Sequence, residues 1–216
     1  MRVPYSLRGA ARGLSARLWR PIADVLAALM TLTSIAWALS FQRTIGLDLY
    51  PQQYFAAILF FVMPIAFLTM PLKKGGVRDI APWFDVAFAL LSAALLAYIF
   101  VAYPKIVLMI FSRSMEVWVP GLLLVVLVLE ALRRATGWAL VLIIGAFFLY
   151  GLFGDIFPGR LQGRAQPVDL LVGYLAVDSN GMLGLPMAIA STVVMAFIFF
   201  GVLLGLTVGS RFFTDA

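Results

Sequence analysis

The sequence contains neither cysteine nor histidine. Without cysteine the chain can form no disulfide and has no thiolate, and without histidine it lacks the commonest acid–base group and the commonest metal ligand. It also has no phosphate-binding segment of the G-x-x-x-x-G-K-[ST] type. We therefore expect no enzymatic activity, no catalytic residue, no metal and no cofactor.

Charged residues are also scarce. They make up 12% of the 216 residues, whereas 63% are hydrophobic. A soluble domain of this size needs more charged side chains to cover its exterior. The composition therefore predicts a membrane protein.

Apolar runs recur along the chain at lengths that suit a bilayer, since about 20 helical residues rise about 30 Å, the thickness of the hydrocarbon core. Six spans are expected, at residues 22–41, 53–70, 81–102, 117–132, 138–157 and 186–208. Pro104 and the polar residues after it are expected to end the third span. Val168, Leu171 and Leu175 recur at helical spacing and predict a short interfacial helix before the sixth. The expected fold class is all-α, a polytopic membrane protein with about six transmembrane helices.

The N-terminal segment, residues 1–20, carries five arginines and no acidic residue. Its apolar residues fall on one stripe of a helix: Leu7, Ala11, Leu14 and Leu18. This pattern predicts a basic amphipathic helix on the membrane surface. A cleaved signal peptide is a second interpretation, because Ala36-Trp37-Ala38 has a small-x-small pattern. The length of the first apolar run and the apolar character of the rest of the chain favour the surface helix.

Basic residues predict the orientation, because Lys and Arg concentrate in cytoplasmic loops. With the N-terminus in the cytoplasm, eleven of the 16 basic residues fall on the cytoplasmic side and five on the other. Six spans then place both termini in the cytoplasm. The net charge of +6 is explained by this asymmetry and by attraction to anionic lipid, so we expect no nucleic-acid partner.

A charged corner at residues 130–137 separates the fourth and fifth spans. It is expected to be a tight turn between antiparallel helices, and its arginines determine which side of the membrane it faces. Glu130 precedes Arg133 by three residues and Arg134 by four, the spacings at which opposite charges on a helix pair. We interpret Glu130 as a structural partner of these arginines and not as an ion-coupling group.

Two other acidic residues lie in spans, where ionisable groups are functional candidates. Asp24 follows Arg20 by four residues near the cytoplasmic start of the first span, and Asp85 lies near the cytoplasmic end of the third. Neither is at the midplane, where a proton relay or an ion site would be expected. We interpret both as structural anchors, Asp24 through a helical pair with Arg20.

Glycines recur every four residues in the sixth span, at Gly201, Gly205 and Gly209. Small residues at this spacing allow another helix to approach closely in lipid, which predicts a helix-packing face. Glycine is also generally common in membrane helices, and this alternative stays open.

Several segments resemble a known permease, in the same order along the chain. They are residues 129–138 (LEALRRATGW), 148–154 (FLYGLFG), 181–192 (GMLGLPMAIAST), 200–201 (FG) and 211–216 (RFFTDA). Here the chain resembles the fused permease of tripartite ATP-independent periplasmic (TRAP) transporters, of the subfamily paired with TAXI-type solute receptors. Residues 1–128 resemble the small Q-type portion of such fusions only in their pattern of spans.

The resemblance implies three parts. They are a basic N-terminal segment at 1–20, a Q-like four-span bundle at 21–132, and the start of an M-like permease portion at 133–216, with two spans and an extracytoplasmic segment between them. It also implies a permease component of a secondary transporter in the bacterial inner membrane. Driven by an ion gradient, such a system takes a solute, expected to be an organic acid, from a periplasmic TAXI-type binding protein.

Two departures from the family pattern shape this expectation. Members of the family carry an acidic and a basic residue soon after the Phe-Gly pair, where this chain has Gly205 and Leu206. The later helical hairpins, which resemble sodium and substrate sites in the family, would lie downstream of Ala216. The chain is therefore expected to be incomplete alone and to need the remaining M-like helices, with membrane lipid around it. A non-transporting membrane scaffold or assembly subunit is the alternative.

Overall fold

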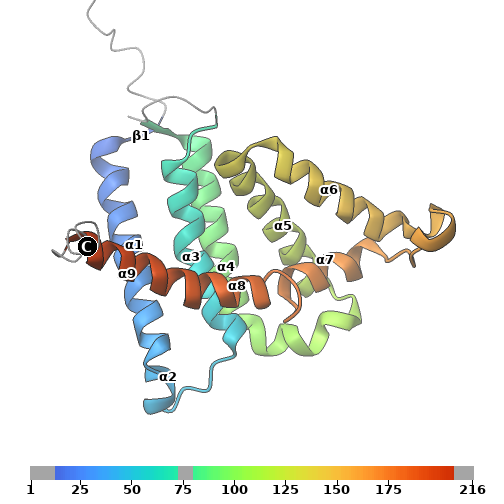
Figure 1. Cartoon of the computed structure of the whole chain (residues 1–216), viewed down its shortest axis with the longest axis horizontal. Helices are drawn as coiled ribbons and strands as arrows, with labels where there is room; N and C mark the ends of the chain where they lie inside the picture. The colour runs from blue at the N-terminus through green and yellow to red at the C-terminus, as the bar shows by residue number, and fades with distance from the viewer. Residues whose placement is uncertain (1–12, 73–79, 207–216) are drawn as a thin grey trace, which may run out of the picture.

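Apolar helices make up most of the computed structural model, which describes residues 13–72 and 80–206 (Figure 1). The longest are α1 (Ala16–Ala38), α3 (Pro51–Thr69), α4 (Trp83–Met109), α5 (Met115–Thr136) and α6 (Trp138–Phe153). In the described part, six segments are long and apolar enough to cross a membrane: Trp19–Ala38, Pro51–Thr69, Trp83–Met109, Met115–Thr136, Trp138–Ile156 and Leu185–Gly205. The protein is therefore an all-α, polytopic membrane protein, as the sequence predicted.

Shorter elements connect these helices. They are α2 (Phe41–Thr44), the 3₁₀ turns η2 (Ile110–Ser112), η3 (Gly154–Ile156) and η4 (Gly159–Leu161), α7 (Val168–Val177), α8 (Leu185–Ala188), the π-helical η5 (Ile189–Val194) and α9 (Met195–Leu206). Two strands, β1 (Gly13–Ser15) and β2 (Ile80–Pro82), pair antiparallel with Leu14 opposite Ala81. This pairing holds the start of α1 beside the start of α4.

The helix α3 is the centre of the packed bundle. Half of the residues in its span are buried, against 6% in the first, fifth and sixth spans. It packs mainly against α4 and α1, while α5 packs against α4 and α7. Large side chains with almost no exposure fill this core: Phe67, Leu96, Ile99, Tyr103 and Leu124. By contrast α6, which leads away from the bundle, has no buried residue (Figure 1).

Side-chain hydrogen bonds to backbone carbonyls join segments that are distant in sequence. Gln53 caps its own helix by accepting from the N–H of Tyr50 at 3.0 Å, and its amide donates to the carbonyl of Phe100 at 2.8 Å. The hydroxyl of Tyr103 donates to the carbonyl of Val177 at 3.3 Å. Such bonds strengthen where water is excluded, so they fix α3 on α4 and α7 on α4.

The last apolar segment, from α8 to α9, runs across α1 and α3 instead of alongside them (Figure 1). The segment is attached to α3 at the π-helical η5, where the buried hydroxyl of Tyr54 donates to the carbonyl of Ser191 at 3.0 Å. Beyond this point the side chains of α9 are mostly exposed.

Three sequence expectations about element boundaries were wrong. The third span does not end at Pro104, because α4 continues to Met109. Tyr103 and Ile106 are almost fully buried there, so packing holds the helix despite the missing N–H of the proline. The corner at 130–137 is a tight turn, as expected, but the predicted end of the fourth span was wrong. The helix α5 runs to Thr136, past the expected boundary at residue 132, and Gly137 alone makes the turn with φ 96°.

The third difference is at the N-terminus. Residues 13–15 form a strand paired with β2, and α1 begins at Ala16, so the surface helix expected over 1–20 is not continuous. Residues 1–12 of that helix lie outside the described part. The short helix expected near Val168 is present as α7, and its buried face is Val172, Gly173, Ala176 and Val177.

Candidate functional site: a buried arginine cluster

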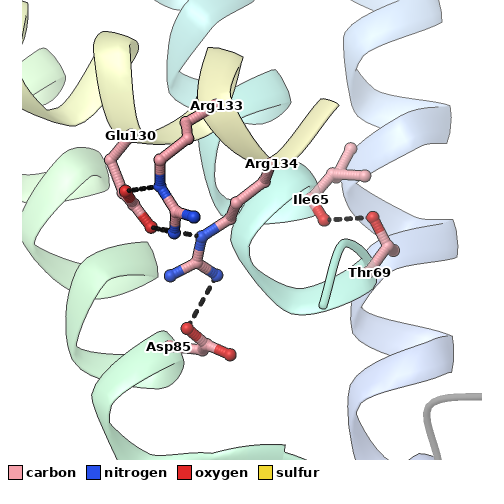
Figure 2. A network of polar contacts seen from close by, with 6 residues as sticks. All are labelled: Ile65, Thr69, Asp85, Glu130, Arg133 and Arg134. Atoms are coloured by element: carbon pink, nitrogen blue, oxygen red, sulfur yellow. Dashed lines mark hydrogen bonds and ion pairs between the residues drawn. The ribbon is translucent and has the colours of Figure 1, made fainter. Parts of the chain in front are cut away.

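The charged end of α5 forms a polar cluster inside the bundle (Figure 2). Glu130 and Arg134 are one helical turn apart, so their side chains meet on one face, and Arg134 Nε donates to Glu130 Oε1 at 2.8 Å. The guanidinium of Arg134 reaches further and lies 2.7 Å from Asp85 Oδ1, measured from Nη1. The side chains of Arg134 and Asp85 are 0% and 1% exposed, so this ion pair is buried.

Arg133 forms the outer half of the cluster. Its Nε donates to Glu130 Oε2 at 2.8 Å and its Nη2 donates to Glu130 Oε1 at 2.7 Å. The guanidinium therefore binds the carboxylate in a bidentate arrangement. Its Cζ also lies 5.3 Å from the ring centre of Trp138, the first residue of α6. Arg133 therefore links the end of α5 to the start of α6, while Arg134 points inward.

Aromatic rings enclose the inner guanidinium. The Cζ of Arg134 lies 5.0 Å from the ring centre of Phe67 on α3 and 5.7 Å from that of Phe88 on α4. The two rings are themselves 5.5 Å apart. A desolvated cation over an aromatic face is worth about 2 kcal/mol. Beside the cluster, the Thr69 hydroxyl donates to the carbonyl of Ile65 at 2.7 Å, at the end of α3 (Figure 2). The side chain of Arg134, on α5, thus contacts both α3 and α4.

The charges of the cluster balance, because Asp85 and Glu130 face Arg133 and Arg134. Taking charges out of water costs several kcal/mol per ion, and only close pairing offsets this cost. Arginine keeps its proton in proteins, so a buried guanidinium serves poorly as a proton carrier. The arrangement suits a rigid junction between helices.

The remaining site residues from the sequence do not join this cluster. Asp24 is exposed and makes no ion pair with Arg20, so the expected helical pair was wrong. Arg20 instead lies over the ring of Trp19, with its Cζ 5.6 Å from the ring centre. Gly201 and Gly205 are open, since a Cβ at either would meet nothing within 4 Å. Gly209 lies outside the described residues.

Sequence reasoning missed the partners that come from other helices. The pairing of Glu130 with Arg133 and Arg134 follows from their spacing along one helix and is present. The pairing of Asp85 with Arg134 depends on how α4 and α5 pack, and no spacing in the sequence encodes it. The available signal was an acid in the first turn of one apolar helix and an arginine at the end of the next.

A second group of charges lies near the other ends of α4 and α5. Lys105 pairs with Glu116, and Arg113 Nε lies 3.7 Å from Asp169 Oδ2. Three of these side chains are exposed and Asp169 is partly buried, and ion pairs this close to solvent are worth about 0–1 kcal/mol. Within residues 13–72 and 80–206, no group of three or more acidic side chains is placed to hold a metal ion.

Comparison with protein-family models, with curated proteins and with solved structures found no match to this chain.

Proposed function

We propose that the chain is a membrane permease component of a TRAP-type secondary transporter. In this role it belongs to a system that takes an organic acid from a periplasmic TAXI-type binding protein and moves it with an ion gradient. The observation that carries the proposal is that the residues resembling the permease family are also residues that hold the helices together. The segment that resembles the permease family over residues 129–138 contains Glu130, Arg133 and Arg134, which join the packed helices.

The distribution of burial supports a component role. The helices α3, α4 and α5 are locked together, whereas α6 and α9 expose apolar side chains along most of their length. In a bilayer such faces contact lipid or further helices. We assign them to contacts with the remaining M-like helices, which would hold the substrate and the coupling ion.

The placement of charge supports a cytoplasmic orientation for the cluster. The start of α1 lies by the start of α4 through the β1–β2 pair, and Asp85 near the start of α4 contacts Arg134 at the end of α5. Arg20, Arg133 and Arg134 therefore gather at one end of the bundle. Basic residues concentrate on the cytoplasmic side, so we propose that this end faces the cytoplasm of a bacterial inner membrane, as do both termini.

A non-transporting scaffold or assembly subunit is the second candidate, and one observation favours it. In the described part, the buried charged residues are Asp85 and Arg134, and they pair with each other. Neither is therefore available to carry an ion or a proton through the bundle. This candidate does not explain the resemblance after residue 129.

Reconstitution in liposomes distinguishes the two candidates. A permease component is needed for uptake itself, so liposomes with the M-like helices and the binding protein should accumulate organic acid only when this chain is present. A scaffold changes how much M-like protein is assembled but not uptake per assembled molecule. Uptake by the M-like helices without this chain would contradict the permease proposal, as would uptake by this chain alone.

A further inference from the structure

Two hollows meet at Trp37, the penultimate residue of α1. One, of about 330 Å³, lies between Trp37 and the following loop, and it is lined by Gln42, Arg43 and residues 47–51. The other, of about 210 Å³, lies between α1, Tyr54 of α3, and the segment from η5 to α9. Trp37 lines both. They therefore adjoin at this residue.

Trp37 is held in place, so the junction is preformed. Its ring stacks on that of Tyr54 with centres 4.4 Å apart and planes 3° from parallel. Tyr54 is 3% exposed, and its hydroxyl donates to the carbonyl of Ser191. These contacts fix α1, α3 and η5 around the two hollows.

The inner hollow is apolar in effect, although hydroxyl side chains line it. Each hydroxyl already donates to a carbonyl one turn earlier in its own helix. The bonds are Thr31 to Ala27 at 3.0 Å, Ser34 to Met30 at 3.0 Å, Ser191 to Met187 at 2.7 Å and Thr192 to Ala188 at 2.6 Å. Ile35, Met195 and Phe199 complete the wall. The hollow therefore offers little to a polar solute and suits a hydrocarbon chain.

The outer hollow carries one charge of each sign. Arg43 and Asp48 both line it, and neither forms an ion pair with another described residue. An arginine beside a carboxylate that it does not neutralise complements a ligand with both an anionic and a cationic group.

The charged hollow and the apolar hollow follow each other along α1 in the order in which a headgroup and an acyl chain follow each other in a lipid. The first span ends at Ala38, so the charged hollow lies at the membrane boundary and the apolar one lies further along the span. Tryptophan is enriched at this boundary, between headgroup and hydrocarbon.

We propose that the two hollows together bind one phospholipid whose headgroup carries a phosphate and a primary ammonium, as in phosphatidylethanolamine. Arg43 binds the phosphate and Asp48 the ammonium. One acyl chain passes Trp37 and lies between α1, α3 and η5. The proposal rests on the membrane fold and stands independently of the transport function.

The test is lipid retention by the purified full chain, measured by native mass spectrometry. Delipidated protein is titrated with phosphatidylethanolamine, phosphatidylglycerol or phosphatidylcholine of the same acyl length. The wild type should retain phosphatidylethanolamine best. Arg43→Gln should weaken retention of all three lipids about tenfold, the size expected for one charge-assisted bond. Asp48→Asn should abolish the preference for phosphatidylethanolamine over phosphatidylglycerol.

Two further variants serve as controls. Arg160→Gln removes an exposed arginine that lines neither hollow and should leave retention unchanged. Ala196→Phe fills the inner hollow and should weaken retention with the headgroup contacts intact. Equal retention by the wild type, Arg43→Gln and Asp48→Asn would overturn the proposal, as would a wild-type preference for phosphatidylglycerol. Displacement of the lipid by phosphoethanolamine, which has no acyl chain, at equal concentration would also overturn it and indicate a site for free headgroups.

Discussion

Arg134 and Asp85 form a buried ion pair between the end of α5 and the start of α4, with Nη1 2.7 Å from Oδ1. Both side chains are withdrawn from solvent, and two phenylalanine rings flank the guanidinium. A pair of this kind is costly to build, yet far more costly to break on one side, because the remaining charge stays buried without its partner. We therefore expect the pair to favour one register of α4 against α5.

Asp85→Asn should destabilise the protein strongly, because among the described residues it leaves Arg134 with one carboxylate partner, Glu130. Loss of one member of a buried pair costs about 3–5 kcal/mol. Thermal unfolding in detergent measures the effect, and the amount of folded protein recovered gives a second readout. Asp24→Asn makes the same chemical change at an exposed position and should change stability by less than about 0.5 kcal/mol. Equal melting temperatures for the two variants would show that the buried pair contributes little.

Glu130→Gln should have a smaller effect. Glu130 is partly exposed, and its amide replacement can still accept a hydrogen bond, while Asp85 continues to balance Arg134. The expected cost is about 1–2 kcal/mol of stability. In the assembled transporter that we propose, uptake per molecule should be unchanged. Loss of ion-driven uptake at normal membrane levels would instead assign Glu130 a part in coupling.

The parts of this cluster that the sequence predicted are those within one helix. Glu130, Arg133 and Arg134 pair at spacings fixed by helical geometry, so no tertiary knowledge is needed. The same spacing rule failed for Arg20 and Asp24. Arg20 lies over the ring of Trp19 instead of pairing with Asp24. The rule therefore identifies possible pairs, and burial decides which of them form.

The fold shows the same division between local and tertiary information. Apolar length and spacing predicted six membrane-length segments and the short helix α7. Pro104 did not mark the end of the third span, because residues around it are buried and packing keeps them helical. The strand pair of Gly13–Ser15 with Ile80–Pro82 joins segments distant in sequence, and neither is long enough to show an alternating pattern. Contacts of this kind depend on packing and were not predictable from the residues alone.

Single cysteines test the membrane orientation, since the native chain has none. Gln162 lies in the exposed segment after α6, and Thr136 lies at the exposed end of α5, beside the arginine cluster. A membrane-impermeant thiol reagent should label Gln162→Cys in intact cells and should leave Thr136→Cys unlabelled until the membrane is opened. The reverse pattern would contradict a cytoplasmic arginine cluster.

Tyr54→Phe should loosen the last apolar segment from the bundle. The change removes the hydroxyl that donates to Ser191 but keeps the ring that stacks on Trp37. A hydrogen bond of this kind contributes about 1 kcal/mol, so amide hydrogen exchange over residues 185–205 should speed up about fivefold. Tyr98→Phe is a matched control, because the Tyr98 hydroxyl donates to the carbonyl of Glu116 at an exposed position. Unchanged exchange in Tyr54→Phe would mean that other contacts hold η5.

Gly205→Leu separates a packing role from a role in folding. A Cβ at Gly205 meets nothing within 4 Å, so a larger side chain has no neighbour in this chain to displace. The isolated protein should fold as well as the wild type, since leucine has a higher helix propensity than glycine.

If this face contacts the remaining M-like helices, as we propose, the new side chain should overpack that contact at a cost of about 1–3 kcal/mol. Co-purification with those helices should then fall at least about fivefold. Gly145→Leu introduces the same change on α6, where a Cβ also meets nothing within 4 Å. Because α6 is assigned to the same contacts, the relative losses of the two variants show which helix carries more of the association. Unchanged co-purification of Gly205→Leu would place the contact elsewhere on the molecule, whereas a defect in the isolated chain would show that Gly205 serves the fold itself.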